Sequence, residues 1–203
     1  MVVAELDVVE GQWWSAVFSP DGRYVVTNTT GAIQIWDAAT GAALGSIEEY
    51  DLTGNSILWT PDGTRLIVGG YDGNIRIFDA GMILEGVSDR EAIVRAITAH
   101  DTFMWLVDLE GGRILSAAIG EPAKVWDLET GTLVGEFGTS DDIVAAAFHR
   151  AEPILYAALG ADQIGIFTLD PDELMEIARS RLSRDLTEEE CQLYLRRSCA
   201  EDG

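Results

Sequence analysis

The chain has very little positive charge. Its 203 residues include 13 lysines and arginines against 35 aspartates and glutamates, a formal net charge of −22, and Lys124 is the only lysine. Nucleic-acid binding needs a basic surface that neutralises phosphates, and anionic membranes attract basic segments. The composition therefore disfavours nucleic acid and membrane as partners, and an acidic rim would steer a basic protein partner instead.

Cysteine and long apolar runs are also scarce. Cys191 and Cys199, the only cysteines, are too few for a disulfide scaffold. They could bridge, but a buried thiol and a free thiol are the simpler expectation. No apolar run approaches the roughly 20 residues of a membrane-spanning helix, and the N-terminus shows no signal-peptide pattern. These features, with 47% hydrophobic residues, predict a folded cytoplasmic protein of one domain, with at most an appendage.

Four similar segments follow one another along the chain. An aromatic residue near the end of each recurs roughly every 40 to 50 residues, the period of a structural repeat. The segments are SAVFSPDGRYVVTNTTGAIQIWDAATG at 15–41, SILWTPDGTRLIVGGYDGNIRIFDAG at 56–81, MWLVDLEGGRILSAAIGEPAKVWDLETG at 104–131 and VAAAFHRAEPILYAALGADQIGIFTLD at 144–170.

Each segment alternates strand patterns with tight turns. In the first, Pro20-Asp21-Gly22 offers a preset φ and a positive φ for a turn, and the residues at 24–27 are β-branched or aromatic. Alternation with a period of two between glycine-containing turns predicts antiparallel strands. A fourth, outer strand is expected at 42–47 after the first segment and at 132–137 after the third.

These residues resemble the WD-repeat β-propeller family, over roughly residues 2–169. The resemblance rests on FSPDG at 18–22, TPDG at 60–63, IQIWD at 33–37, IRIFD at 75–79 and KVWD at 124–127. It implies an all-β fold of four WD-type blades of four strands each, which bury their faces on one another. The implied blades span about 10–50, 51–99, 100–141 and 142–169, with 2–9 as an outer strand.

Family blades often carry a buried network of His, Ser or Thr, Asp and Trp. The resemblance therefore implies structural roles for His100, Ser116, Trp36, Phe78, Trp126 and Phe167. The third repeat reads Gly120-Glu121-Pro122 where the family has its Asp. We therefore expect no repeat to hold the whole network, and cohesion to come mainly from apolar packing between blades.

Three ways of completing the ring stay open. The strand expected at 2–9 could supply the outer strand that the fourth repeat lacks, which would close a ring of four blades. The chain could instead be the closing part of a longer propeller. Two half-rings could also pair, because open edges expose unpaired backbone groups and apolar faces.

The remaining segments differ from the repeats. Residues 82–92 form an insertion for which we expect a short helical turn in a solvated spacer. From Asp170 the apolar period changes to 3.6, and Asp170-Pro171-Asp172-Glu173 is a helix start. A second helix is expected from Thr187, so residues 170–203 form a helical appendage. Its segment at 177–195 resembles the tails of actinobacterial WD-repeat signalling proteins.

The sequence contains few residues that could carry catalysis. His100 and His149 are the only imidazoles, and neither lies at a zinc-ligand spacing from Cys, His or carboxylate. No nucleophile elbow, phosphate loop or dinucleotide fingerprint is present. The sequence therefore predicts no catalytic residue, no metal and no cofactor, and a propeller hydrolase or lyase is the weakest hypothesis.

The leading functional prediction is a non-catalytic scaffold or sensor module for protein–protein interaction. The alternative is the closing fragment of a larger signalling or regulatory protein, without independent activity. By analogy with the family, partner contacts lie where each first strand begins and in each second turn. These positions are Trp14, Asn55, Met104, Val144, Asp72 and Glu121. Self-association through open propeller edges is a further expectation.

Overall fold

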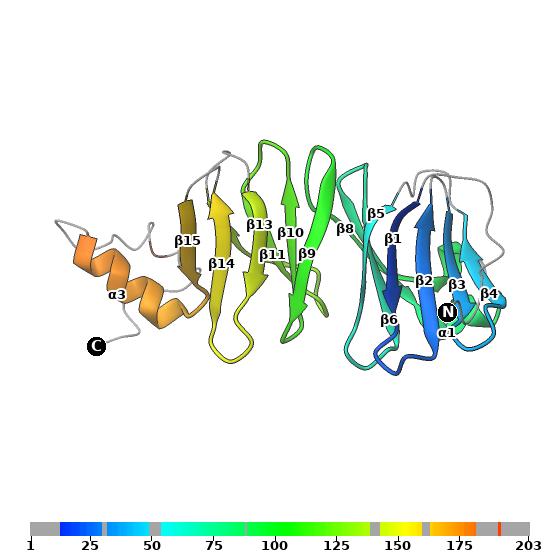
Figure 1. Cartoon of the computed structure of the whole chain (residues 1–203). Coiled ribbons are helices and arrows are strands. Elements are labelled where there is room, and N and C mark those ends of the chain that lie inside the picture. Colours follow the sequence, from blue (N-terminus) through cyan, green and yellow to red (C-terminus); the bar gives the residue numbers. More distant parts are fainter. Residues whose placement is uncertain are drawn as a thin grey trace.

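The described strands form four antiparallel sheets (Figure 1). The computed structural model describes residues 13–29, 32–48, 54–87, 89–138, 143–159, 163–181 and 191. The first sheet is β1 (Trp13–Phe18), β2 (Tyr24–Thr29), β3 (Ala32–Asp37) and β4 (Ala43–Ile47). The second is β5 (Gly54–Trp59), β6 (Arg65–Gly70), β7 (Asn74–Asp79) and β8 (Ile93–Thr98). The third is β9 (Met104–Glu110), β10 (Arg113–Ala118), β11 (Ala123–Asp127) and β12 (Leu133–Phe137). The fourth is β13 (Ile143–Phe148), β14 (Ile154–Leu159) and β15 (Gln163–Thr168).

The turn chemistry of the sequence accounts for the first hairpin of the first and second sheets. Gly22, after Pro20-Asp21, takes a φ of 71°, which costs glycine little. Ser19 Oγ donates a hydrogen bond of 2.6 Å to Asp21 Oδ1. Thr60 and Asp62 repeat this bond in the second sheet, at 2.5 Å. The predicted all-β, antiparallel architecture is therefore confirmed.

The pairing of the second with the third strand shows which residues occupy equivalent positions in the four sheets. In each sheet, alternate residue pairs of the second and third strands point to opposite faces. We call forward face the side directed toward the next sheet in the chain, and back face the opposite side. Forward-face pairs are Val26–Ile35, Ile67–Ile77, Leu115–Val125 and Tyr156–Ile166. Back-face pairs are Val25–Trp36, Leu66–Phe78, Ile114–Trp126 and Leu155–Phe167.

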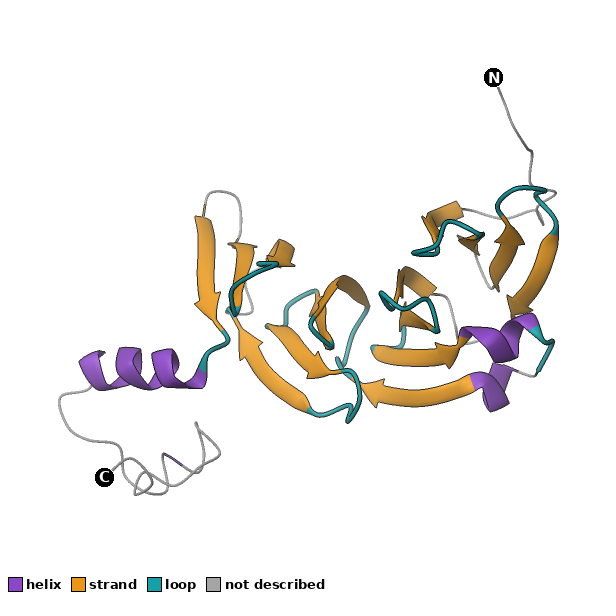
Figure 2. Cartoon of the chain, turned by 90° about the horizontal axis from the view of Figure 1, so that it is seen from below, coloured by secondary structure: helices purple, strands orange, loops and turns teal. Residues whose placement is uncertain are grey.

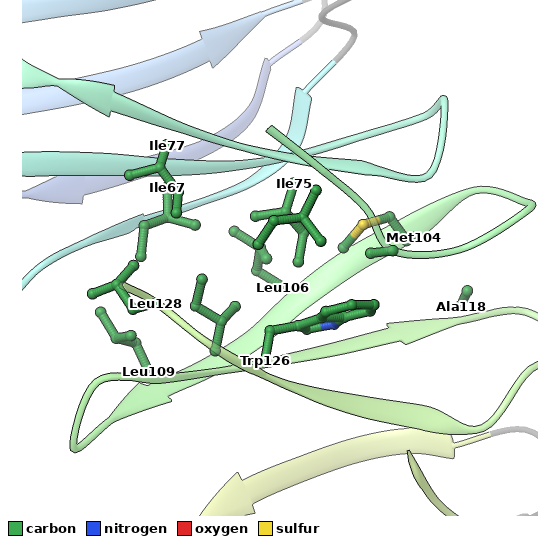
Figure 3. Packing of buried hydrophobic residues seen from close by; sticks show 12 residues of the cluster. Ile67, Ile75, Ile77, Met104, Leu106, Leu109, Ala118, Trp126 and Leu128 are labelled. Carbon is green, nitrogen blue, oxygen red and sulfur yellow. The ribbon is translucent and has the colours of Figure 1, made fainter. Parts of the chain in front are cut away.

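Three buried clusters hold neighbouring sheets together, and each joins a forward face to a back face. Between the second and third sheets, Ile67 and Ile77 pack with Met104, Leu106 and Trp126 (Figure 3). The first sheet packs on the second in the same manner, and the third on the fourth. Cohesion between sheets is therefore largely apolar, as the sequence predicts.

The sheets succeed one another around an open arc (Figure 2). Contacts link β1 with β5, β5 with β9, and β9 with β13. The first and fourth sheets lie at opposite ends of the arc. The strand expected at 2–9, which would complete the fourth sheet, lies outside the described residues.

The insertion between the second and third repeats is a packing element and not a solvated spacer. It forms α1 (Ala80–Leu84) and α2 (Asp89–Ala92). Ile83 is buried in the cluster between the first and second sheets. A Cβ on Gly45 of β4 would lie 2.8 Å from the Ile83 carbonyl oxygen. The prediction of a spacer is wrong because the apolar side chains of the insertion cover the outer part of these two sheets.

A helix follows β15, as predicted. α3 spans Pro171–Arg181, and the backbone N–H of Asp172 donates to Asp170 Oδ1 at 2.9 Å. The change of apolar period predicts that Leu174 and Ile177 lie on one buried face, which is wrong: they are 42% and 37% exposed, whereas Met175 is buried.

Little else of the appendage is described. The helix expected from Thr187 lies outside the described residues, apart from Cys191. That residue is buried and disulfide-bonded, so the expectation of two unpaired thiols is wrong. No helix within the described ranges has the length and apolar character needed to cross a lipid bilayer.

Candidate protein-binding face

The six predicted contact positions lie along one edge of the arc, where first strands begin and second strands turn into third strands. This is the upper edge in Figure 1. Trp14, Asn55 and Val144 belong to β1, β5 and β13, and their side chains lie outside the described part of the chain. The burial and contacts of the Met104, Asp72 and Glu121 side chains can be compared with the predicted partner contacts.

Met104 is a core residue and not a rim contact. Its side chain is fully buried between the second and third sheets (Figure 3). It packs in the cluster that contains Ile75 and Trp126. The prediction for this position is wrong because β9 directs the first side chain of the strand into the packing between sheets.

Three apolar side chains lie on loops at the same edge. Tyr71 comes from the β6–β7 turn, Phe103 from the loop before β9, and Ile119 from the β10–β11 turn. Tyr71 is 38% exposed and Ile119 is 61% exposed. The Tyr71 and Phe103 rings lie 4.5 Å apart between centroids. We call these three residues the upper-rim cluster.

Backbone contacts fix the loops that carry the upper-rim cluster. The backbone N–H groups of Ala99 and His100 both donate to the Gly73 carbonyl, each at 3.0 Å. Thr102 Oγ1 donates to the Ile119 carbonyl at 3.3 Å. The apolar side chains of the upper-rim cluster are therefore held on connected loops of two neighbouring sheets.

Acidic side chains flank the upper-rim cluster. Asp72 follows Tyr71, and its carboxylate accepts hydrogen bonds from Arg76 at 2.6 and 3.1 Å and from Asn74 at 2.7 Å. Burial acts to raise the pKa of Asp72, but these hydrogen bonds outweigh it and lower the pKa. Asp101, next to the cluster, is exposed. The edge thus combines apolar side chains with acidic ones.

Glu121 completes a buried network in the third repeat, where the sequence analysis expected a gap. Its Oε2 atom lies 3.0 Å from His100 Nδ1. His100 Nε2 lies 2.9 Å from Ser116 Oγ, which accepts the Trp126 N–H at 2.9 Å. The expectation that no repeat holds the whole network is wrong, because the longer glutamate side chain reaches the histidine from this turn.

The network also accounts for the protonation of its members. Burial lowers the pKa of His100, so the ring is neutral, with Nδ1–H donating to Glu121 and Nε2 accepting from Ser116. For Glu121, burial acts to raise the pKa, but hydrogen bonds from Lys124, the Asp101 N–H and His100 lower it to about 2. Glu121 therefore holds the loops together, and its carboxylate is engaged within the chain.

The hydrogen bond between the tryptophan N–H and a hydroxyl group is present in the first repeat and absent from the second and fourth. Thr27 Oγ1 in the first repeat accepts the Trp36 N–H at 2.8 Å. The second repeat has Phe78 instead of tryptophan, and the fourth has Phe167. At the register position of Thr27 and Ser116 these two repeats carry Val68 and Ala157. Each repeat therefore has both partners of the hydrogen bond or neither.

His149 has a different role from His100. It occupies the position of Ser19 in the turn of the fourth repeat, as predicted, and Nδ1 accepts the backbone N–H groups of Ala151 and Glu152 at 3.3 and 3.0 Å. The ring therefore supports a turn. Within the described ranges, no group of three His, Cys, Asp or Glu side chains could hold a metal ion.

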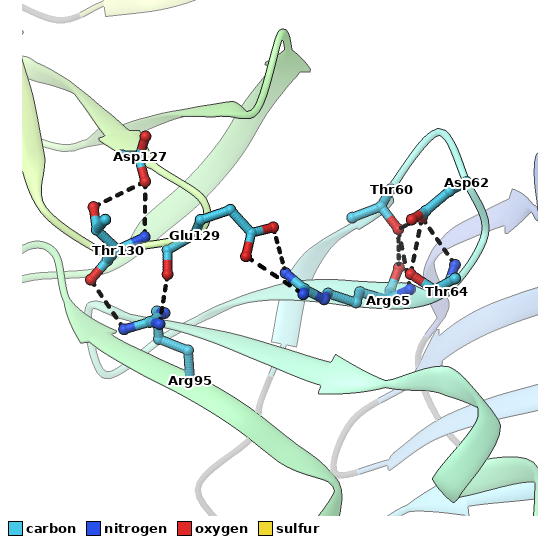
Figure 4. Close-up of polar contacts among 8 residues, drawn as sticks. All are labelled: Thr60, Asp62, Thr64, Arg65, Arg95, Asp127, Glu129 and Thr130. Atoms are coloured by element: carbon cyan, nitrogen blue, oxygen red, sulfur yellow. Dashed lines mark hydrogen bonds and ion pairs between the residues drawn. The ribbon is translucent and has the colours of Figure 1, made fainter.

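A cleft of about 250 Å³ lies at the opposite edge, between the second and third sheets. Arg65 spans it, with Nη1 2.9 Å from Glu129 Oε1 (Figure 4). Nearby, Arg95 donates to the carbonyls of Glu129 and Thr130 at 2.5 and 2.9 Å. These contacts connect the second and third sheets across the cleft.

Comparison with known proteins identifies the repeats. The model of the family described as "WD domain, G-beta repeat" matches residues 6–37 and 52–79. The WD repeat-containing protein 18 of Danio rerio is 25% identical over 175 residues, which cover 83% of this chain and 38% of that protein. The pre-rRNA-processing protein IPI3 of Mycosarcoma maydis is 26% identical over 157 residues, or 69% of this chain and 27% of that protein. The chain therefore spans less than half the length of these relatives, both of which are eukaryotic.

Solved structures agree on the fold. The computationally designed protein Ika4 superposes with a TM-score of 0.69 at 18% identity, over 84% of this chain and 99% of that one. Ika8, also designed, gives 0.68 at 18% identity, over 82% of this chain and 48% of that one. These likenesses concern the fold alone. The chain is therefore similar to WD40 repeat proteins, with the family model confined to residues 6–37 and 52–79 and with relatives at 25% and 26% identity.

Proposed function

We propose that this chain is a non-catalytic protein-interaction module that binds a basic partner on the upper-rim cluster. WD-repeat proteins generally act as interaction scaffolds, and neither relative has a name that denotes an enzyme. The observation that carries the proposal is the contact of Tyr71 with Phe103 across two loops, beside the exposed Ile119, whose backbone carbonyl accepts a hydrogen bond from Thr102. Aromatic and aliphatic anchors of this kind dominate the binding energy of protein interfaces.

The charge around the cluster favours a partner with lysine or arginine side chains. Asp101 beside the anchors is exposed, whereas Asp72 is already paired with Arg76, and the whole chain carries a net charge of −22. Opposite charge at the rim of an interface accelerates encounter and excludes acidic competitors. RNA fits this face poorly, although one relative is named for pre-rRNA processing, because its phosphates would meet carboxylates.

The alternative from the sequence is a closing segment of a larger signalling protein. The relatives' greater length supports a larger parent protein, and their names do not support an actinobacterial signalling origin. On this alternative the upper rim would bind nothing when the chain is isolated, so a binding experiment separates the two proposals.

The test selects ligands from a random peptide library displayed on phage, with the whole chain as bait. We expect enrichment of peptides with lysine or arginine next to an apolar residue. Their binding should weaken at least about tenfold in Tyr71→Ala and Ile119→Asp, since an anchor contributes at least ~1.4 kcal/mol. The matched control is Val134→Asp, at a 43% exposed position on β12.

Two results would overturn the proposal. One is selection of no peptide above background. The other is selection of peptides that bind the Tyr71→Ala and Ile119→Asp variants as tightly as the original chain.

A further inference from the structure

The forward face of the fourth sheet is open, although the same face is covered in every other sheet. In the first three sheets, the nine forward-face side chains at these register positions are all 0% exposed. They are Val26, Ile33, Ile35, Ile67, Ile75, Ile77, Leu115, Ala123 and Val125. In the fourth sheet the equivalent residues are Tyr156, Ile164 and Ile166, which are 38%, 76% and 65% exposed.

At the other end of the arc, the back face of the first sheet is exposed at Phe18, whereas Trp36 of the same face is 1% exposed. Phe18 of β1 pairs with Val25, as Leu109 pairs with Ile114 and Phe148 pairs with Leu155. Leu109 and Phe148 are 8% and 6% exposed because the preceding sheet covers them, whereas Phe18 is 67% exposed. Among the described residues, apolar side chains are therefore exposed on the first sheet at Phe18 and on the fourth at Tyr156, Ile164 and Ile166, and exposed apolar patches of this kind mark interaction surfaces.

The three internal clusters show what fits these faces. Each cluster joins the forward face of one sheet to the back face of the next. The open forward face at one end of the arc therefore complements the open back face at the other. Within one chain the two faces lie apart on the open arc (Figure 2), so a second copy is the partner that brings them together.

We propose that two copies of this chain associate head to tail, with Phe18 of each copy packed against Tyr156 and Ile166 of the other. Each copy supplies one forward and one back face, so a two-fold axis forms both contacts at once and closes the assembly. The net charge of −22 on each copy opposes association, and salt screens that repulsion. The pair should therefore form more tightly as ionic strength rises. This inference does not depend on the proposed upper-rim function.

Sedimentation equilibrium of the whole chain in 0.3 M salt tests the proposal. We expect a species of twice the 22.0 kDa chain mass, which dissociates on dilution and dissociates at least tenfold more readily in 0.05 M salt. Phe18→Arg and Ile166→Glu, at opposite ends of the chain, should each give a monomer. Val94→Glu, at a 48% exposed position on β8, is the matched control and should stay paired.

Mixing the two monomeric variants tests the head-to-tail arrangement. A mixed pair has one unaltered contact, and in the other contact the introduced arginine of one chain would face the introduced glutamate of the other. We therefore expect Phe18→Arg and Ile166→Glu chains to restore a dimer together, although neither forms one alone. A face-to-face dimer would not be rescued by mixing.

The outcomes separate the alternatives. A monomeric original chain would overturn the proposal, and so would a dimer that survives both substitutions, a dimer that mixing does not restore, or growth into open filaments. Circular dichroism verifies that the variants are folded, which is expected because both side chains are already more than half exposed. Ile164→Glu, at the 76% exposed neighbouring position, serves as a second variant if Ile166→Glu fails to fold.

Discussion

A hydroxyl group under the tryptophan distinguishes the first and third repeats from the other two. Thr27 and Ser116 each accept an indole N–H, whereas Val68 and Ala157 lie in the same register position in the two repeats that carry phenylalanine. A buried N–H without an acceptor is costly, but removal of both partners can be nearly neutral. This explains why Phe78 and Phe167 occur without loss of the blade core.

Substitution of this pair in the first repeat should show strong coupling. Thr27→Val leaves the Trp36 N–H, which is buried, without an acceptor, so the free energy of unfolding should fall by ~1 to 3 kcal/mol. Trp36→Phe alone leaves a small void and an unused hydroxyl. The double variant, which copies Val68 and Phe78 of the second repeat, should lose at least ~0.5 kcal/mol less than the sum of the single changes.

Urea unfolding of the four chains completes this double-mutant cycle. Ala39→Ser, in the exposed turn after β3, is a control that should leave the midpoint almost unchanged. Strict additivity of the two substitutions would mean that the hydrogen bond does not link them.

The neutral state of His100 predicts a pH dependence. Because burial lowers its pKa, the folded chain holds fewer protons on this ring than the unfolded chain does below pH ~6.5. The free energy of unfolding should therefore fall as the pH drops from 7.5 to 5.5. Glu121, whose pKa is lowered to about 2, contributes its own loss only at more acidic pH, below its usual pKa of 4.5.

Comparison with His100→Gln isolates this effect. The variant should lose less stability than the original chain between pH 7.5 and 5.5, measured by urea unfolding at each pH. His149→Gln, which removes the other imidazole, is the matched control for general effects of histidine loss. Equal pH slopes in the original chain and His100→Gln would contradict a neutral, network-bound His100.

At the scale of elements, two turns contain positions that require glycine. Gly22 and Gly73 have nearly the same conformation, with φ of 71° and 75°. A Cβ on Gly22 would meet nothing within 4 Å, whereas one on Gly73 would collide with the His100 carbonyl oxygen. The turn at Gly22 requires glycine because of its positive φ. The turn at Gly73 requires it for the same reason and also because the His100 carbonyl leaves no room for a side chain.

Alanine at these two positions separates strain from close approach. Gly22→Ala should cost ~1 to 2 kcal/mol, the penalty of a positive φ. Gly73→Ala should cost at least ~1 to 3 kcal/mol more, because the loop before β9 must move away. Thermal unfolding monitored by circular dichroism measures both, and equal losses would show that the contact between the two loops is not tight.

Polar bridges act between neighbouring elements where apolar packing ends. Arg150, in the turn after β13, contacts the carboxylates of Asp108 and Glu110 of β9. Asp108 also accepts the Phe148 N–H at 3.0 Å. With Arg65 and Glu129 between the second and third sheets, these contacts set how one sheet lies on the next.

At the scale of the whole molecule, the row of sheets exposes apolar side chains of a back face at one end and of a forward face at the other. Neighbouring sheets cover one another, so among the described residues the exposed side chains of these faces, Phe18, Tyr156 and Ile166, lie in the first and last sheets. Net charge opposes self-association over distances up to roughly the Debye length, about 10 Å at 0.1 M salt. The balance between these two effects decides whether the chain pairs, as the proposed head-to-tail contact requires.

The repeats, their strands and the start of the last helix could be predicted from the sequence. They depend on local patterns such as Pro20-Asp21-Gly22, alternation over 32–37 and Asp170 before Pro171, which act within a few residues. The contact positions could be placed at one edge for the same reason. Met104 could not be assigned to the core, since its burial depends on a neighbouring sheet.

What the sequence by itself determined is therefore the repeat and the conformation of each short segment, because strand alternation and turn chemistry are properties of adjacent residues. Only the tertiary structure decided that Glu121 reaches His100, that Tyr71 meets Phe103 and that Ile166 is 65% exposed. These outcomes depend on side-chain reach and on the stacking of sheets far apart in the chain, which no local pattern specifies.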